Sequence, residues 1–240
     1  MEELYLNNKM KSLIINSVNN LYLKEYTEKA YKFLEYSKQF ISNGDYCLDI
    51  GSSIGSTALP MAINGAEKVI CFEPSRQRFE VLLSNIKQNN LENEIVALNA
   101  AASEKHNEKV KLFNTHTLDN GGLEEYCFNK HECSPEIINT LNISIFLQEK
   151  FSLEQISKIK FIKIDTEGAD AEILRSLKPI LSIVKPVIMV EWFFNEKFNK
   201  ELFDSIEYIN YNATSPEDFS NRNFTDFYLK KVGDLVLFPK

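Results

Sequence analysis

The spacing of hydrophobic positions changes near residue 43. Before it, apolar and aromatic residues recur at roughly helical intervals, which predicts a helical N-terminal extension over residues 1–42. From residue 43 to 240, short apolar runs alternate with amphipathic stretches, as in one continuous domain. We expect the extension to pack on this domain. Dimerisation and closure of an acceptor pocket are the alternative roles.

The apolar runs and the periodic stretches predict the elements of this domain. Strands are expected at residues 46–50, 68–72, 94–98, 110–113, 143–148, 159–164, 186–190, 207–211 and 234–238. Helices are expected at residues 56–64, 76–90, 169–177 and 198–207. Such alternation is typical of an α/β fold, a parallel sheet covered by helices through right-handed crossovers. Residues 114–141 lack this rhythm, and we expect a partly mobile flap over the active site there.

Composition and charge narrow the class of protein. The chain has 240 residues and a net charge of −7, so no positive field attracts nucleic acid. No apolar run approaches the roughly 18 residues of a membrane span, and the N-terminus lacks the basic and apolar regions of a signal peptide. We therefore expect a cytoplasmic protein whose four cysteines are free thiols.

A glycine turn follows the first predicted strand. Gly51 permits a tight turn and a close ligand approach, and Gly55 lets the next helix pack closely, with Ser52 and Ser53 between them. This G-x-x-x-G spacing differs from the G-x-G-x-x-G of dinucleotide sites. Asp49, two residues before the first glycine, would repel a pyrophosphate. The turn therefore favours a ligand with positive charge, such as S-adenosylmethionine, over a dinucleotide.

An acidic residue also follows the second predicted strand. Glu73 lies about twenty residues beyond the glycine turn, the place of a carboxylate that binds ribose hydroxyls. Its two oxygens suit two vicinal hydroxyl groups. Pro74 stiffens the turn. A solvated surface turn is the alternative interpretation.

A charged stretch, K-I-D-T-E-G-A-D, closes the strand predicted at 159–164. It contains Lys163, Asp165 and Glu167, and ligands of open α/β sheets bind at the carboxyl ends of strands. Glu191 ends the next parallel strand, beside the only tryptophan. Lys163 is also interpretable as a structural ion-pair partner, and Asp170 as a residue that favours a helix N-terminus.

Together these features resemble the FkbM family of S-adenosylmethionine-dependent methyltransferases over residues 46 to 192. The F-E-P turn matches at 72–74, and the K-I-D-x-E-G-x-E signature matches at 163–170 with Asp in place of the last Glu. Ser52 and Ser53 stand where the family has an Asn. The resemblance implies a seven-stranded, Rossmann-like class I fold with cofactor contacts at residues 49–55, at Glu73 and Pro74, and at Ala100 and Ala101. It also implies O-methylation, most often of a sugar hydroxyl or a polyketide-type product.

Methyl transfer to a hydroxyl requires positioning of the acceptor and removal of its proton. Asp165 is the first candidate for the general base, because its strand end faces the cofactor crevice. Glu167 and Glu191 are close alternatives, and His116 in the flap is a fourth candidate. Lys163 is expected to orient a carboxylate or to carry charge to the acceptor.

Two metal hypotheses arise from these residues. Asp165 together with Glu167 or Glu191 also suits Mg²⁺, which prefers carboxylate and water ligands. The series Cys127, His131 and Cys133 has soft ligands for zinc, but it lacks a fourth ligand and matches no common spacing. We therefore expect no zinc site, and we keep Mg²⁺ as an open hypothesis.

The sequence thus favours an S-adenosylmethionine-dependent O-methyltransferase acting on a sugar hydroxyl of a surface glycan or its nucleotide-linked precursor. A natural-product, lipid or protein acceptor is the alternative within the same chemistry. A nucleotide-binding dehydrogenase and a non-catalytic binding module are hypotheses of other classes. The glycine spacing counts against the dehydrogenase, and the charged stretch at 163–170 counts against an inert module.

Overall fold

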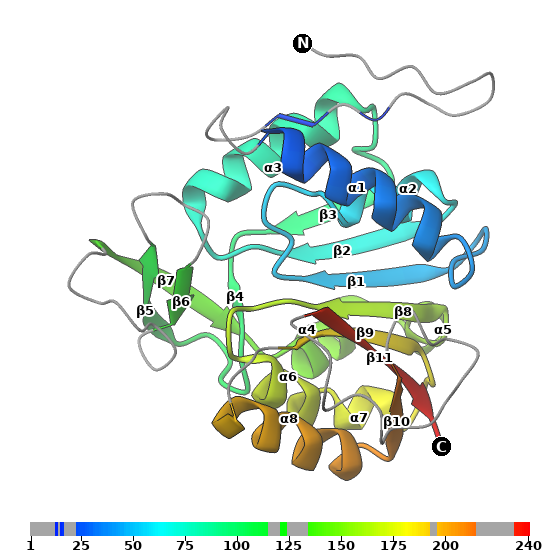
Figure 1. Cartoon of the computed structure of the whole chain (residues 1–240), viewed down its shortest axis with the longest axis vertical. Helices are drawn as coiled ribbons and strands as arrows, with labels where there is room; N and C mark the ends of the chain where they lie inside the picture. Colours follow the sequence, from blue (N-terminus) through cyan, green and yellow to red (C-terminus); the bar gives the residue numbers. More distant parts are fainter. Residues whose placement is uncertain are drawn as a thin grey trace.

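A seven-stranded sheet forms the centre of the computed structural model, which describes residues 13, 15–16, 23–114, 121–123, 134–192, 196–214 and 233–240 (Figure 1). The strand order is β10-β11-β9-β8-β1-β2-β3. The strands are β1 (Tyr46–Ile50), β2 (Lys68–Phe72), β3 (Ile95–Leu98), β8 (Ile159–Ile164), β9 (Val187–Trp192), β10 (Tyr211–Thr214) and β11 (Gly233–Pro239). β11 is antiparallel to both of its neighbours, and the other pairs are parallel. The predicted seven-stranded, mostly parallel sheet is confirmed.

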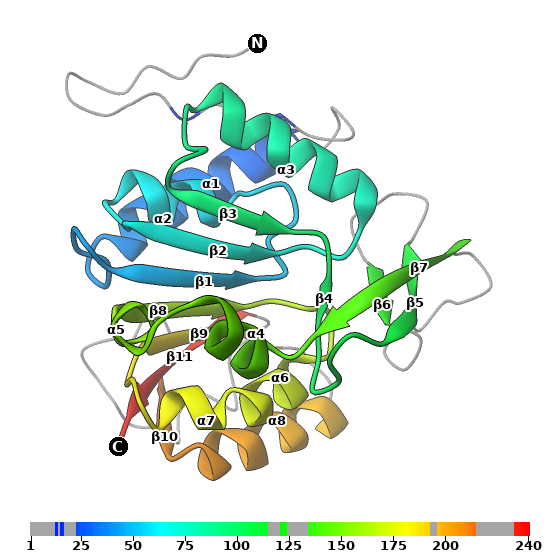
Figure 2. The same ribbon diagram turned by 180° about the vertical axis from the view of Figure 1, so that it is seen from behind.

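Helices cover both faces of this sheet (Figures 1 and 2). One layer contains α1 (Leu23–Ser37), α2 (Ala58–Ile63) and α3 (Arg76–Gln88). The opposite layer contains α4 (Ile143–Lys150), α5 (Leu153–Ser157), α6 (Asp170–Ser176), α7 (Lys178–Leu181) and α8 (Glu196–Tyr208). Because strand side chains alternate between faces, Cys47 packs with the first layer and Leu48 with the second. None of the described helices is long and apolar enough to cross a membrane.

Helix α1 belongs to the predicted N-terminal extension and packs on the first face. Ala30 and Phe33 are buried in the core that this layer shares with the sheet. The ring of Phe33 lies 6.2 Å from the ring of Phe161 in β8, centroid to centroid. The described part of the extension is therefore attached to the central strand that leads to the charged stretch.

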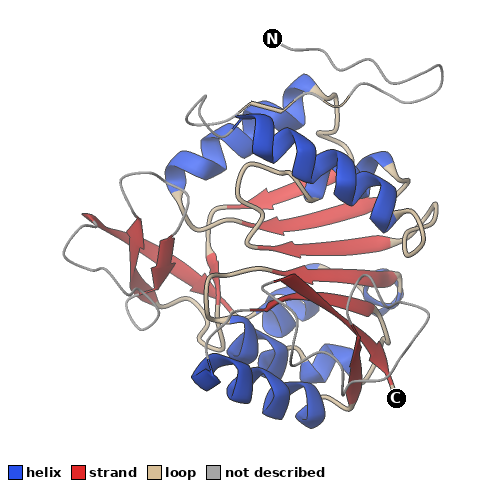
Figure 3. Ribbon diagram, viewed as in Figure 1, coloured by secondary structure: helices blue, strands red, loops and turns tan. Residues whose placement is uncertain are grey.

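A second, four-stranded sheet lies beyond the carboxyl ends of the central strands (Figure 3). Its order is β4-β7-β5-β6, with β4 (Ala101–Ala102), β5 (Lys109–Asn114), β6 (Gly121–Leu123) and β7 (Ser134–Leu141). Both β6 and β7 fall within the 114–141 segment, so the predicted irregularity is wrong for these residues, which pair with β5. Residues 115–120 and 124–133 lie outside the described part of the chain, so the flap remains a prediction.

Two predicted strands are wrong in the structure. Residues 143–148 begin helix α4, where the side chain of Asn142 accepts a hydrogen bond from a backbone N–H of the first turn. The buried side chains of α4 follow helical spacing and include Ile143, Phe146 and Leu147. Residues 207–211 were expected to form a strand, but α8 continues to Tyr208 and β10 begins only at Tyr211.

Candidate active site

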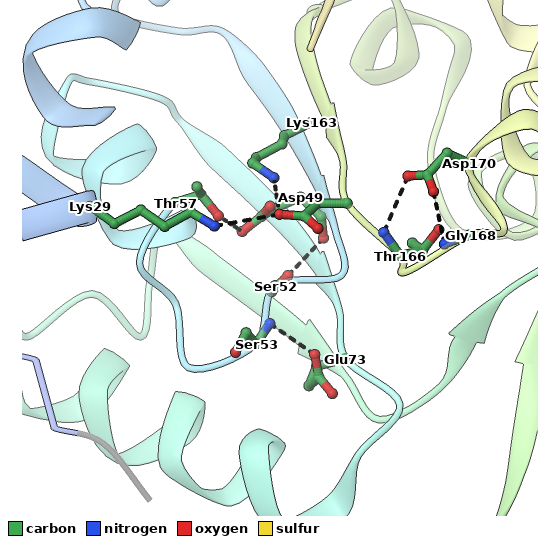
Figure 4. Close-up of polar contacts among 11 residues, drawn as sticks. Lys29, Asp49, Ser52, Ser53, Thr57, Glu73, Lys163, Thr166, Gly168 and Asp170 are labelled. Carbon is green, nitrogen blue, oxygen red and sulfur yellow. Dashed lines mark hydrogen bonds and ion pairs between the residues drawn. The ribbon is translucent and has the colours of Figure 1, made fainter. Parts of the chain in front are cut away.

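Acidic side chains gather where the central parallel strands end (Figure 4). Asp49 lies near the end of β1, Glu73 directly follows β2, Asp165 directly follows β8, and Glu191 lies near the end of β9. Asp234 of β11 is the register partner of Glu191. The fold therefore brings together at one sheet edge the carboxyl groups that the sequence singled out, and it adds Asp234.

The glycine turn is shaped by close packing. Gly51 has a φ of +83°, and a Cβ placed on it would lie 1.8 Å from the backbone oxygen of Asp165. Gly55 has a φ of +96°, and a Cβ there would lie 2.3 Å from Leu59 Cδ1. Ser53 between them also has a positive φ, of 49°. The glycine at position 51 thus lets the backbone turn after β8 come close to the glycine turn. Gly55 allows the close helix packing that the sequence predicts.

Asp49 holds the glycine turn from inside the protein. Its Oδ2 accepts a hydrogen bond from Thr57 Oγ1 at 2.8 Å, and its backbone oxygen accepts one from Ser52 Oγ at 2.7 Å. Burial raises the pKa of Asp49, an effect that the Lys163 ammonium opposes. Asp49 Oδ1 is buried and has no hydrogen-bond partner. The turn therefore leaves one strong acceptor unsatisfied.

Glu73 connects the glycine turn with the turn after β2. Its Oε2 accepts the Ser53 N–H at 2.8 Å, and its Oε1 accepts the Ser75 N–H at 2.8 Å. Burial raises the pKa of Glu73 to about 7, although the Arg78 guanidinium opposes the shift. Each carboxylate oxygen has two acceptor positions, and these two backbone bonds occupy one on each oxygen. The arrangement fits the predicted ribose contact.

Two lysines flank Asp165. The buried Lys163 Nζ donates to Asp165 Oδ2 at 2.7 Å, and Lys29 Nζ of α1 lies 3.6 Å from the same oxygen. Burial opposes ionisation of Asp165, yet the two lysines hold its pKa well below the usual range. Burial also disfavours the charged form of Lys163, but Asp165, Asp234 and Asp49 raise its pKa. Asp165 is thus an oriented, fully ionised carboxylate and a weak base.

Glu191, in contrast to the ionised Asp165, is a protonated carboxyl group. Burial and the neighbouring Asp165 charge raise the pKa of Glu191 well above its usual range. At neutral pH it therefore holds a proton, which it donates in the hydrogen bond to Asp165. Its Oε2 is buried without a partner. A neutral carboxyl group does not accept the proton of a hydroxyl, so Glu191 is a poor candidate for the base.

Glu167 combines partial access with an intermediate pKa. Burial and the Asp165 charge raise the pKa of Glu167 to about 7. Its φ of +57° is unusual for a residue other than glycine, and such strain concentrates at functional sites. Asp170 holds the turn, because its Oδ1 and Oδ2 accept the N–H groups of Thr166 and Gly168 at 3.2 Å each. The turn presents Glu167 beside the other carboxyl groups.

The remaining candidates divide between described and undescribed parts of the chain. Ala100 and Ala101 are buried between the end of β3 and the start of β4, with Ala101 as the first residue of β4. His116 and the Cys127–Cys133 series lie outside the described residues. Within the described ranges, no three His, Cys, Asp or Glu side chains are grouped to hold a metal ion. The Mg²⁺ hypothesis, which needs only Asp165 with Glu167 or Glu191, stays a prediction.

Several residues of the site were missed from the sequence. Lys29 and Asp234 reach it from distant elements. Asn85, buried in α3, donates to the backbone oxygen of Ile54 in the glycine turn at 2.8 Å and accepts the Asn16 N–H at 2.8 Å. A polar residue between the apolar positions of α3 was the available signal for Asn85. No comparable pattern marks Lys29, because its contact depends on how α1 packs.

Comparison with solved structures shows the fold. A proposed rRNA-methylase from Clostridium thermocellum has a TM-score of 0.53 at 8% identity, over 87% of this chain and 93% of that one. An O-methyltransferase from Bacillus cereus in complex with SAH has a TM-score of 0.49 at 11% identity, over 95% of this chain and 84% of that one. Precorrin-6y C5,15-methyltransferase from Geobacter metallireducens GS-15 has a TM-score of 0.47 at 12% identity, over 89% of this chain and 87% of that one. The first supports a shared class I methyltransferase fold.

Comparison of the sequence identifies the family. No curated protein matches the chain. A family model described as the methyltransferase FkbM domain matches residues 49–213, which is more than half of the chain. The matched range begins at Asp49 and includes the strand-end residues from Glu73 to Glu191, but not α1. The chain belongs to the FkbM family and is an S-adenosylmethionine-dependent methyltransferase.

Proposed function

We propose that the chain methylates a hydroxyl oxygen, with Glu167 as the general base. A hydroxyl acceptor loses its proton when the new C–O bond forms. A base is most effective when its pKa lies near the working pH. Among the described strand-end carboxyl groups, Glu167 combines partial exposure with a pKa raised to about 7, and this observation carries the proposal.

The residues at the strand ends fit the cofactor. Buried acceptors without partners, Asp49 Oδ1 and Glu191 Oε2, lie at the same edge as the ionised Asp165. This surplus of acceptors suits a ligand with hydroxyl groups and positive charge. Glu73 would hold the ribose, and Asp165 would lie at the positively charged end. When bound, S-adenosylmethionine supplies a methyl group already activated on a sulfonium.

Neighbouring residues set the pKa and the position of Glu167. Lys163 fixes the carboxylate of Asp165 through a 2.7 Å hydrogen bond. The charge of Asp165 in turn adds to the raised pKa of Glu167. Asp170 holds the backbone turn on which Glu167 stands. Glu167 then takes the proton of the acceptor hydroxyl, a step that typically contributes about 10²–10⁴-fold to the rate.

We propose a sugar hydroxyl of a glycan, or of its nucleotide-linked precursor, as the acceptor. Carboxylates accept hydrogen bonds from several hydroxyl groups at once, which suits a neutral sugar ring close to Glu167. The test is incubation with S-adenosylmethionine and separate panels of glycans, nucleotide sugars, lipids and peptides, followed by mass spectrometry. A gain of one methyl group on a sugar supports the proposal. Methylation confined to lipids or peptides contradicts it.

We expect Glu73→Ala to weaken binding of S-adenosylhomocysteine at least tenfold. The change removes the carboxylate proposed to bind the ribose, and hydrogen bonds to a charged group contribute about 1.5–3 kcal/mol each. It also frees the N–H groups of Ser53 and Ser75, so the melting temperature is recorded beside the calorimetric titration. Glu92→Ala, at an exposed site, is the control. Unchanged affinity in Glu73→Ala would remove this residue from the cofactor site.

A further inference from the structure

Lys29 links helix α1 to the proposed cofactor site. Figure 4 shows the side chains of Lys29 and Lys163 converging from α1 and β8. Lys29 Nζ lies 3.6 Å from Asp165 Oδ2, although α1 is outside the residues that match the family. Ala30 and Phe33 bury the same helix against the sheet, with Phe33 beside Phe161 of β8. The backbone that carries Lys29 is therefore fixed relative to Asp165.

The two lysines of Asp165 differ in how firmly they are held. The side chain of Lys163 is 2% exposed and its Nζ lies 2.7 Å from Asp165 Oδ2, whereas the side chain of Lys29 is 52% exposed and its Nζ lies at 3.6 Å. Partly exposed ion pairs contribute little to stability, so moving the Lys29 ammonium costs little. Lys163 is thus a permanent partner of Asp165, and Lys29 is an exchangeable one.

We infer that Lys29 is a specificity-determining residue that competes with the positive charge of S-adenosylmethionine for Asp165. The inference rests on the proposed cofactor site. S-adenosylmethionine carries one positive charge more than S-adenosylhomocysteine, so a lysine beside Asp165 disfavours the former more strongly. Lys29 therefore favours the product form over the reactant form of the cofactor. Interactions that favour loss of the sulfonium charge assist the transfer step.

The test is calorimetric titration of the full chain with S-adenosylmethionine and with S-adenosylhomocysteine. We expect Lys29→Met to tighten binding of the first about threefold to tenfold more than binding of the second, and added salt to reduce this difference. Lys29→Arg keeps the charge and should keep the wild-type ratio. Lys24→Met, on the same helix with a side chain 86% exposed, is the matched control. Lys29→Gln provides a second neutral variant.

The outcomes separate the inference from the proposed function. The inference alone is overturned if the wild type binds both ligands and the ratio of the two affinities is the same in Lys29→Met and Lys29→Gln as in the wild type. An equal change in Lys24→Met also overturns it, because the effect is then one of net charge. Failure of the wild type to bind either ligand overturns the proposed cofactor site and the inference with it.

Discussion

Replacement of Glu167 by Gln is expected to lower turnover about 10²–10⁴-fold while leaving the affinity for S-adenosylhomocysteine nearly unchanged. The amide has almost the shape of the carboxyl group but cannot accept the proton of the acceptor hydroxyl. Glu167 is partly buried, so the change should not unfold the chain. The measurement is methyl transfer to the acceptor identified by mass gain, with Glu92→Gln at an exposed position as the control.

The pH profile gives a second measure of the same role. A base must be deprotonated to act, and the pKa of Glu167 is about 7. The wild-type kcat, measured with saturating cofactor so that the titration of Glu73 does not enter, should therefore rise with pH through about pH 7, and this rise should disappear in Glu167→Gln. Full turnover in the variant, or an unchanged rise, would show that another group removes the proton.

Replacement of Lys163 by Met is expected to lower the free energy of unfolding by about 3–5 kcal/mol. Lys163 is almost fully buried, and its ammonium is the close hydrogen-bond partner of Asp165. Met fills a similar volume but removes the close ammonium, so the carboxylate of Asp165 keeps the hydrogen bond from Glu191 and, as its remaining described cationic partner, Lys29 at 3.6 Å. Denaturant unfolding at neutral pH measures the difference, and a loss below about 1 kcal/mol would contradict the pairing.

Two further variants and a pH series separate charge from packing. Lys160→Met, at an exposed position of β8, should change stability little. Adding Asp165→Asn to Lys163→Met should restore part of the loss, because no uncompensated charge then remains. The folded pKa of Asp165 is lowered and that of Lys163 is raised. The stabilisation is therefore present between about pH 4 and pH 10, and it is lost as pH falls below or rises above that window.

Strands at the centre of the sheet were the most predictable part of the fold. The bounds predicted for β1, β2 and β8 equal those in the structure. These strands are buried on both faces, so each is a nearly continuous apolar run that ends at a glycine or a charged residue. Their order also fixed the sheet edge at which Asp49, Glu73 and Asp165 meet, since parallel strands end on the same side.

Helix α4 shows where such runs mislead. Its sequence, ISIFLQEK, opens with β-branched and aromatic residues that fit a strand equally well. A helix forms instead, because the side chain of Asn142 caps its first turn and because one helical face buries Ile143, Phe146 and Leu147. A short apolar run does not reveal this outcome, because the partner surface that buries it is formed by distant parts of the chain.

The ranking of the candidate bases also depended on contacts that no local pattern encodes. Asp165 came first by its strand-end position, but Lys163 and Lys29 make it a weak base. Glu191 shared the position, but burial beside Asp165 keeps it protonated. Only the folded arrangement distinguishes these two from Glu167. The sequence thus predicted which carboxyl groups meet at the strand ends, whereas tertiary electrostatics distinguish the roles proposed for them.

Calorimetric titration of the full chain with S-adenosylhomocysteine, with NAD as the comparison ligand, tests the central claim most directly. The strand-end site is proposed to hold a cofactor through Glu73 and Asp165, without a dinucleotide-type glycine turn. Micromolar binding of S-adenosylhomocysteine and no binding of NAD is the predicted result. Binding of NAD alone, or of neither ligand, would contradict the cofactor site proposed for this chain.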